Sequence, residues 1–220
     1  MKPKLTIPDL ISEAEMFCKK PEIFLLQKSD GKSIGTDVEK AFKDHVAEKY
    51  SVIIGDVEKG IDFPESDILT DVKVTSMRQP QSSCPFKDAK QKIFGLGYNL
   101  LVFAYDKNDH QERQAATLEF VSCSFVEKER TGDFTTTFRL REMIKDGANV
   151  DDIFAYLNDK NIPADPITLQ QLAEQILQNP PTQGYLTISN ALQWRLQYQR
   201  VVNLNEPIDG ITKIIDKLNR

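Results

Sequence analysis

The spacing of the apolar residues changes twice along this chain, and these changes limit the folds open to it. From about residue 50 to residue 126 they form short runs or alternate with polar residues, which is typical of β-strands. Helical spacing opens the chain and returns from residue 134 onward, where Gly and Pro residues interrupt it. The sequence therefore predicts an α/β fold, in which a small mixed β-sheet is flanked by helices and followed by a helical C-terminal region.

Individual elements follow from the same pattern. The predicted strands are Ser51–Ile54, Ile68–Ser76, Asn99–Tyr105 and Ala116–Val126. The predicted helices are Pro8–Lys19, Thr36–Tyr50, Lys87–Phe94, Thr135–Lys145, Val150–Lys160, Ile167–Gln178, Ser189–Val201 and Ile208–Leu218. We expect residues 1–130 to form the core and residues 131–220 to form a helical region packed on it, within one continuous domain.

Composition and cysteine content argue against several classes of protein. With 40% apolar and 28% charged residues, the chain resembles an ordinary soluble domain. No window approaches 18 consecutive apolar residues and the N-terminus lacks the apolar run of a signal peptide, so we expect no membrane insertion and a cytoplasmic location. Cys18, Cys84 and Cys123 have unrelated spacings and only His45 and His110 to join them, which fits neither a disulfide framework nor a zinc site.

The distribution of charge does not by itself indicate a partner. The formal net charge is −5, and residues 1–72 hold 10 basic and 15 acidic side chains. Residues 73–113 hold 7 basic and 4 acidic side chains, so a basic stretch follows an acidic one. A difference of this size also occurs on ordinary solvated surfaces, and charge alone therefore does not predict nucleic-acid binding.

The residues best suited to chemistry lie between positions 60 and 76. On a strand, Asp71 and Lys73 share one face, whereas Val72 lies on the other. The turn that contains Asp62 and Pro64 can return a second carboxylate to the open end of that strand. Two carboxylates and a lysine suit metal-assisted phosphodiester hydrolysis, because the acids hold Mg²⁺ and the lysine orients or deprotonates the attacking water.

The acid-x-Lys triplet itself has little specificity. In a chain with 33 acidic residues and 20 lysines it is expected roughly three times by chance, and it occurs at Asp30, Asp71 and Asp88. Asp30 precedes a glycine in a turn signal, and Asp88 lies in a predicted helix. Only the triplet at Asp71 lies on a predicted strand with an acid-x-Pro turn just upstream, which separates it from the other two.

Asp62-Phe63-Pro64, followed after six residues by Asp71-Val72-Lys73, resembles the active-site signature of the PD-(D/E)xK nucleases, and specifically its compact MutH-like arrangement. Two differences from the MutH pattern are a spacer that is longer by two residues and an Asp at position 71 in place of Glu. Stretches downstream of the signature resemble a group of type II restriction endonucleases: Val74–Ser76, Gln79–Phe86 and Gln91–Tyr98. The resemblance covers about residues 34–106, a third of the chain.

The resemblance implies a restriction-endonuclease-like core and a Mg²⁺-dependent endonuclease that cuts double-stranded DNA at specific sequences as a homodimer. It implies that Asp62 and Asp71 are metal ligands and that Lys73 positions or activates water. One alternative is a MutH-like nicking enzyme of DNA mismatch repair. An alternative of another class is a DNA-binding domain that keeps the fold without catalysis, in which Asp62 only starts a turn and Asp71 and Lys73 form a surface pair.

Glu39 has two possible roles. Members of the resembled superfamily often carry an extra carboxylate on a helix ahead of the sheet, which would make Glu39 a catalytic and metal-site residue. Thr36-x-x-Glu39 is also a capping-box pattern, in which Glu39 would bond to the Thr36 amide at a helix N-terminus. The sequence leaves both roles open. Glu65 and Asp67, in the turn after Asp62, are rival carboxylates whose direction the sequence does not fix.

Polar residues after the strand at Asp71 are candidates for DNA contacts. We expect a loop held by Pro80 and Pro85, with donors and acceptors suited to phosphates and base edges. The candidates in this loop are Arg78, Gln79, Gln81, Ser82 and Ser83. On the helix that follows, the candidates are Lys87, Lys90 and Lys92 for a basic wall, and Gln91 to orient a water or a phosphate. Each also fits an ordinary polar surface.

Overall fold

A computed structural model describes most of the chain as two compact units. It describes residues 2–20, 22–25, 31–55, 60–84, 88–110, 112, 115–189 and 194–218. Unit 1 comprises Met1–Ser82, Tyr98–Glu127 and Val201–Arg220, and unit 2 comprises Ser83–Gly97 and Lys128–Arg200. No helix in the described ranges is long and apolar enough to cross a membrane.

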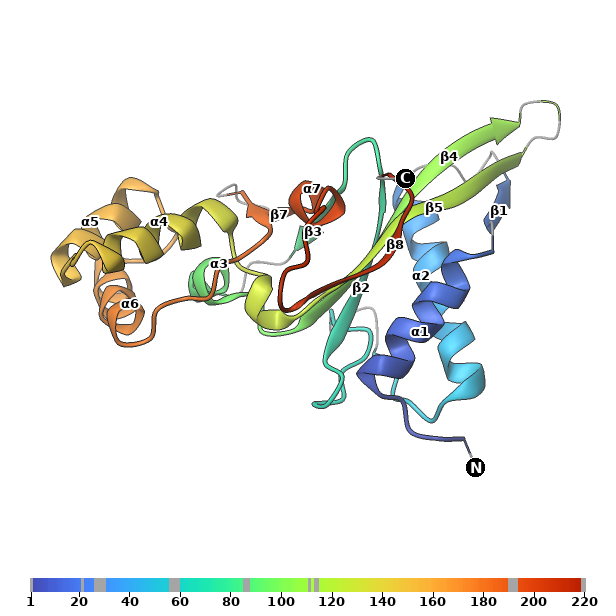
Figure 1. The fold of residues 1–220 in the computed structure, drawn as a ribbon, viewed down its shortest axis with the longest axis horizontal. Helices are drawn as coiled ribbons and strands as arrows, with labels where there is room; N and C mark the ends of the chain where they lie inside the picture. The colour runs from blue at the N-terminus through green and yellow to red at the C-terminus, as the bar shows by residue number, and fades with distance from the viewer. Residues whose placement is uncertain are drawn as a thin grey trace. The chain divides into compact units, whose positions relative to one another are not determined.

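Unit 1 is built on a mixed β-sheet (Figure 1). The described strands are β1 (Glu22–Leu25), β2 (Thr70–Ser76), β4 (Asn99–His110), β5 (Ala115–Val126) and β8 (Ile211–Asp216), in the order β1-β5-β4-β2 with β8 also paired to β5. β2 is parallel to β4, and the other pairs are antiparallel. β1 pairs with residues 115–118 of β5 and β8 with residues 122–126. β2 is thus left at the edge of the sheet, and this edge carries the signature residues.

Two helices cover one face of this sheet (Figure 1): α1 (Ile7–Cys18) and α2 (Gly31–Lys49). Thr6 and Asp9 form a capping box at the start of α1, which satisfies its first backbone amides. Phe42 of α2 packs edge-to-face on Phe103 of β4 at a centroid separation of 5.0 Å and on Phe17 of α1 at 5.3 Å. This buried aromatic cluster fixes α2 next to β2.

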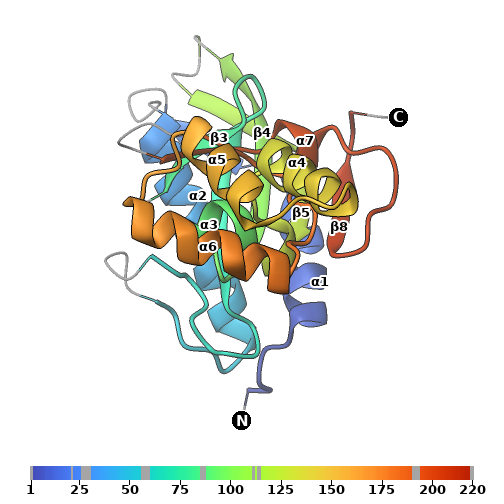
Figure 2. The ribbon, with the colours of Figure 1, turned by 90° about the vertical axis from the view of Figure 1, so that its left-hand side faces the viewer.

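Unit 2 is largely helical (Figure 2). Its helices are α3 (Lys90–Phe94), the 3-10 helix η3 (Lys128–Arg130), α4 (Phe134–Lys145), α5 (Val150–Asp159) and α6 (Pro166–Gln178). Asp133, Asn149 and Asp165 cap α4, α5 and α6 with their side chains. The apolar faces of α3 to α6 share one buried cluster. A second sheet has the order β3-β7-β6, formed by β3 (Gln81–Cys84), β6 (Thr187–Ile188) and β7 (Trp194–Gln197), and α7 (Gln199–Val202) follows β7.

The predicted fold class, a mixed sheet flanked by helices, is confirmed. The three long strands and the helices α1, α4, α5 and α6 lie within about two residues of their predicted limits, except that β4 continues to His110. α2 begins at Gly31, five residues before the predicted start. Of the predicted helix at 87–94, α3 covers Lys90–Phe94, and Lys87 lies outside the described residues. The periodicity of the apolar residues therefore predicted these elements.

Two predicted helices near the C-terminus are wrong. Ile208–Leu218 contains strand β8, because its β-branched residues pair with the open edge of β5 after a turn at Gly210, whose φ is +80°. Ser189–Val201 contains β7 and the short α7, with residues 190–193 outside the described ranges. Leu196 and Tyr198 are buried and their neighbours exposed, which is the alternation of a strand.

The first predicted strand is also wrong. Ser51 forms a single bridge with Lys4, and residues 52–55 are not in a strand. A run of four residues, such as Ser51–Ile54, is too short to form a stable strand unless it pairs with a neighbouring strand. Three short strands, β1, β3 and β6, were not predicted, since two to four residues carry little periodic signal.

Candidate active site

The segment that carries Asp62 is tied back to the free edge of β2. Phe63 and Thr70 form an antiparallel bridge, with the Phe63 amide donating to the Thr70 carbonyl at 2.9 Å and the Thr70 amide donating to the Phe63 carbonyl at 3.0 Å. The Phe63 ring is fully buried and meets Phe42 edge-to-face at 6.3 Å. These contacts bring Asp62 alongside β2, as the turn around Pro64 suggested.

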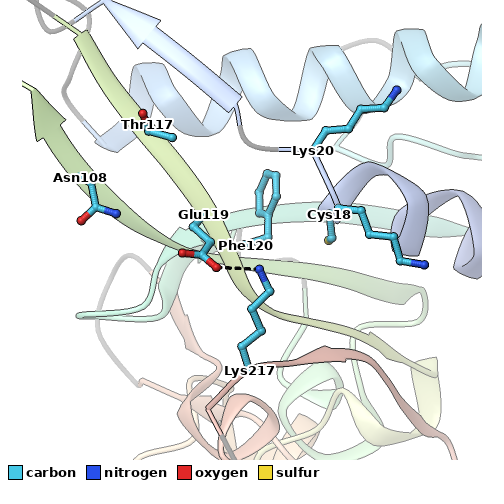
Figure 3. A pocket seen from close by; sticks show the side chains of 8 residues that line it. Cys18, Lys20, Asn108, Thr117, Glu119, Phe120 and Lys217 are labelled. Carbon is cyan, nitrogen blue, oxygen red and sulfur yellow. Dashed lines mark hydrogen bonds and ion pairs between the residues drawn. The ribbon is translucent and has the colours of Figure 1, made fainter. Parts of the chain in front are cut away.

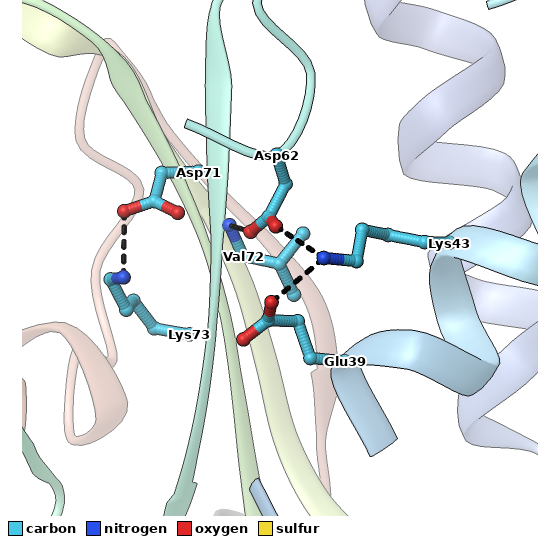
Figure 4. A network of polar contacts seen from close by, with 6 residues as sticks. All are labelled: Glu39, Lys43, Asp62, Asp71, Val72 and Lys73. Carbon is cyan, nitrogen blue, oxygen red and sulfur yellow. Dashed lines mark hydrogen bonds and ion pairs between the residues drawn. The ribbon is translucent and has the colours of Figure 1, made fainter. Parts of the chain in front are cut away.

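Asp62 and Asp71 are buried and take part in polar contacts on the two sides of β2 (Figure 4). The Val72 amide donates to Oδ2 of Asp62 at 2.8 Å, and Nζ of Lys73 lies 2.7 Å from Oδ2 of Asp71. The Asp62 and Asp71 carboxyls lie near enough to influence each other's pKa. Only 7% of Asp62 and 3% of Asp71 is exposed. The structure thus brings the three residues of the signature together.

Burial and mutual repulsion set the charge of this pair. Burial raises the pKa of Asp71 to about 7; Lys73 opposes this shift, and the nearby Asp62 carboxylate adds to it. Burial acts to raise the pKa of Asp62 too, but hydrogen bonds from Lys43, Asp71 and the Val72 amide outweigh it and lower that pKa. Without a metal, the two carboxyls therefore hold a proton between them near neutral pH.

Glu39 and Lys43, one turn apart on α2, extend the network. Nζ of Lys43 donates to Oδ1 of Asp62 at 2.7 Å and to Oε1 of Glu39 at 2.9 Å. The capping role considered for Glu39 is wrong, because α2 begins at Gly31 and Thr36 lies inside the helix. Sequence reasoning did not single out Lys43; its i,i+4 spacing from Glu39 was visible, but its contact with Asp62 was not.

The rival carboxylates of the turn have other partners. Oε2 of Glu65 accepts from the Ile53 amide at 3.3 Å, and Asp67 forms an exposed ion pair with Lys4 at 2.8 Å. Both side chains are thus directed to partners of the loop before β2 and not to Asp62 or Asp71.

The donor atoms of the Asp62–Asp71 pair fit a hard divalent cation. Among the described residues, no group of three or more His, Cys, Asp or Glu side chains is arranged to hold a metal. Mg²⁺, however, is commonly bound by one or two carboxylates with water completing its shell. Each carboxylate oxygen has two lone-pair directions, so Asp62 and Asp71 keep acceptor capacity beyond the contacts already described.

The candidate DNA-contacting residues have diverse environments. Arg78 and Gln79 are exposed in the turn after β2. Gln81, Ser82 and Ser83 do not lie in a loop as predicted; they form most of strand β3, and Gln81 exchanges backbone hydrogen bonds with the Thr75 hydroxyl at 3.0 and 3.2 Å. These two hydrogen bonds hold the backbone at Gln81 beside Thr75 of β2, so the segment after the turn is extended and not a free loop.

The basic helix face is only partly present. Lys90 is exposed at the start of α3, whereas Lys92 is 5% exposed and donates to the Ile188 carbonyl at 2.7 Å. Lys92 therefore cannot belong to a basic wall, since its ammonium is used inside unit 2. Nε2 of Gln91 donates to the Leu96 carbonyl at 3.0 Å, which stabilises the turn after α3.

A hollow of about 260 Å³ in unit 1 is lined by none of the signature residues (Figure 3). Its lining combines lysines with apolar and small polar side chains: Cys18, Lys19, Lys20, Asn108, Thr117, Glu119, Phe120 and Lys217. Nζ of Lys217 pairs with Oε1 of Glu119 at 2.8 Å. Within this lining Glu119 is the single carboxylate, so the hollow lacks the paired acids found at β2.

Comparison with known proteins decides the family. The family model described as "Type II restriction enzyme NspV" matches residues 4–213. This chain belongs to the NspV family of type II restriction enzymes. The type II restriction enzyme NspV of Nostoc sp. is 49% identical over 214 residues, which cover 96% of each chain. No solved structure matches this member of the NspV family.

The NspV match confirms the resemblance to type II restriction enzymes and extends it from a third of the chain to nearly all of it. It spans all of the residues in the polar network of Figure 4, and both compact units. The match therefore includes the C-terminal helical region, for which the sequence alone offered no resemblance.

Proposed function

We propose that this chain is a Mg²⁺-dependent type II restriction endonuclease that cuts double-stranded DNA with a PD-(D/E)xK site. The observation that carries the proposal is the placement of both carboxylates at β2: Asp71 pairs with Lys73, and Asp62 accepts from the amide of the next residue on the strand, Val72. The name of its Nostoc relative, a type II restriction enzyme, supports restriction over mismatch-repair nicking.

In this proposal Asp62 and Asp71 are the metal ligands. Mg²⁺ bound there would stabilise the charge that develops on the phosphate and lower the pKa of a bound water. The Val72 amide holds Oδ2 of Asp62 at 2.8 Å, and the Phe63–Thr70 bridge anchors the backbone next to it. These contacts fix the direction of the Asp62 carboxylate before any ion arrives, which lowers the cost of ordering the site.

Lys73 acts beside this pair. Its ammonium contacts Oδ2 of Asp71 at 2.7 Å, and 22% of its side chain remains exposed, so it can reach a water at the mouth of the site. Burial acts to lower the pKa of Lys73, but Asp71, Asp62 and Glu39 outweigh it and raise that pKa. In the metal-free protein Lys73 is therefore a charged donor that orients water or a phosphate oxygen.

Incubation of the purified protein with unmethylated phage DNA, with and without about 10 mM Mg²⁺, tests this function. We expect discrete fragments that require the metal, and sequencing of their ends would give the recognition site. Intact DNA together with a mobility shift would instead favour the non-catalytic DNA-binding alternative. Nicked circles without linear product would favour the MutH-like alternative.

A further inference from the structure

The ammonium of Lys43 lies between two carboxylates of the proposed site. Its Nζ is 2.7 Å from Oδ1 of Asp62 and 2.9 Å from Oε1 of Glu39, and the residue is 8% exposed (Figure 4). A buried lysine at this place is costly to desolvate unless it is paired. Both carboxylates supply that pairing, so the three groups form one charged unit that joins α2 to the segment before β2.

The position of this ammonium excludes a cation at the same oxygens. A Mg²⁺ ion binds oxygen at about 2.0–2.1 Å, so an ion shared by Oδ1 of Asp62 and Oε1 of Glu39 would need the space that Nζ of Lys43 fills. Asp71 and Lys73, in contrast, lie on the opposite side of β2 from Lys43, Glu39 and the Asp62 carboxylate (Figure 4). The oxygens of Asp71 therefore do not contact the ammonium of Lys43, and a cation held by Asp71 together with Asp62 would not need the space that this ammonium fills.

We propose that Lys43 is a positioning residue that takes the place of a second divalent cation. Its ammonium neutralises Glu39 and holds Oδ1 of Asp62. The site then takes one divalent cation through Asp62 and Asp71, and Glu39 stays outside the set of ligands. This inference rests on the proposed function, because it assumes that Asp62 and Asp71 bind a metal.

Binding of Mn²⁺ alone to the full chain tests the inference without reference to cleavage. Equilibrium dialysis counts the ions, and electron paramagnetic resonance shows whether two bound ions are magnetically coupled. For the unaltered chain we expect one uncoupled ion at Asp62 and Asp71. For Lys43→Met we expect a second ion and a coupled spectrum, because Glu39 and Asp62 regain free oxygens. In the double variant Glu39→Gln, Lys43→Met, the second ion should be lost again.

The variant Glu39→Gln with Lys43 intact gives an independent test, since a glutamine amide oxygen can still accept from Lys43. We expect its Mn²⁺ affinity to stay within about twofold of the unaltered chain, against the 10–100-fold loss typical of groups that support a bound metal. A loss of about tenfold or more would make Glu39 a ligand and overturn the inference. Two coupled ions in the unaltered chain, or an unchanged single ion in Lys43→Met, would also overturn it.

Asp71→Asn separates this inference from the function on which it rests. If Asp71→Asn binds Mn²⁺ as well as the unaltered chain, the proposed metal site itself is wrong. If Asp71→Asn loses the ion while Lys43→Met gains none, the metal site stands and only the role given to Lys43 fails.

Discussion

At the scale of single residues, the site depends on charges that folding forces together. Asp71 is 3% exposed and lies against both Lys73 and the Asp62 carboxyl. Burying two carboxyls in contact favours a shared proton, and a lysine on each side limits the cost. The site in its metal-free form is therefore sensitive to protons near neutral pH.

The first expectation concerns Asp71 and pH. Its pKa is raised by folding from 3.8 to about 7, so the folded protein binds this proton more tightly than the unfolded chain. The stability that this provides is fully present below pH 3.8 and is lost as the pH rises through about 7. In the presence of EDTA, the Tm of the unaltered protein should fall relative to that of Asp71→Asn between about pH 5.5 and pH 8. Parallel Tm profiles for the two proteins would contradict this.

The second expectation concerns Lys73. Lys73→Ala should reduce the rate of DNA cleavage by about 100-fold or more, the usual range for a group that moves or orients a reacting proton. Its DNA affinity, measured by mobility shift, should change little. Lys107→Ala is a matched control, because Lys107 pairs with Asp109 at 2.9 Å with the same two-residue spacing on β4. Equal cleavage by Lys73→Ala and Lys107→Ala would remove Lys73 from the site.

At the scale of elements, a short loop bound to the edge of β2 sets the position of Asp62. The Gly55 amide donates to the Asp62 carbonyl at 2.8 Å, so the backbone at Asp62 is held by Gly55 as well as by the Phe63–Thr70 bridge. A Cβ on Gly55 would lie 2.0 Å from the Ile61 carbonyl oxygen, so no side chain fits there without moving the Asp62 segment. A glycine that contacts only the backbone of the site thereby supports the position of Asp62.

The third expectation follows from this packing. Gly55→Ala should lower the free energy of unfolding by about 1–3 kcal/mol, as overpacking does, and should weaken Mg²⁺-dependent cleavage by displacing Asp62. Gly35→Ala, inside α2, meets only an ordinary contact of 3.5 Å with the Val74 carbonyl. That change should stabilise the protein by about 0.5–1 kcal/mol. Urea denaturation measures both effects, and destabilisation of equal size in the two variants would be evidence against the role given to Gly55.

At the scale of the whole molecule, the family relationship and the proposed chemistry bear on assembly. The chain is 25.1 kDa, and the proposed site contains the groups to cut one strand. Double-strand cleavage at a palindromic sequence needs two such sites related by a two-fold axis, which a symmetric dimer provides.

The fourth expectation is accordingly a homodimer on DNA. Sedimentation of the protein in Ca²⁺ with DNA that contains its recognition site should give a complex of two chains, about 50 kDa of protein. Linear product should also appear from circular DNA without an accumulation of nicked circles. A single chain bound to DNA, with nicked circles as the end product, would contradict the dimer.

The sequence by itself determined the features that depend on neighbouring residues. Strand alternation places Asp71 and Lys73 on one face, the turn at Pro64 brings back Asp62, and long helical patterns predict α1 and α4 to α6. The tertiary structure decided the features that depend on distant parts of the chain. Lys43 meets Asp62 across 19 residues, and β8 is a strand because β5 offers it an open edge. The local sequence pattern does not reveal contacts of this kind, since their free energy comes from packing and pairing between segments that are far apart in sequence.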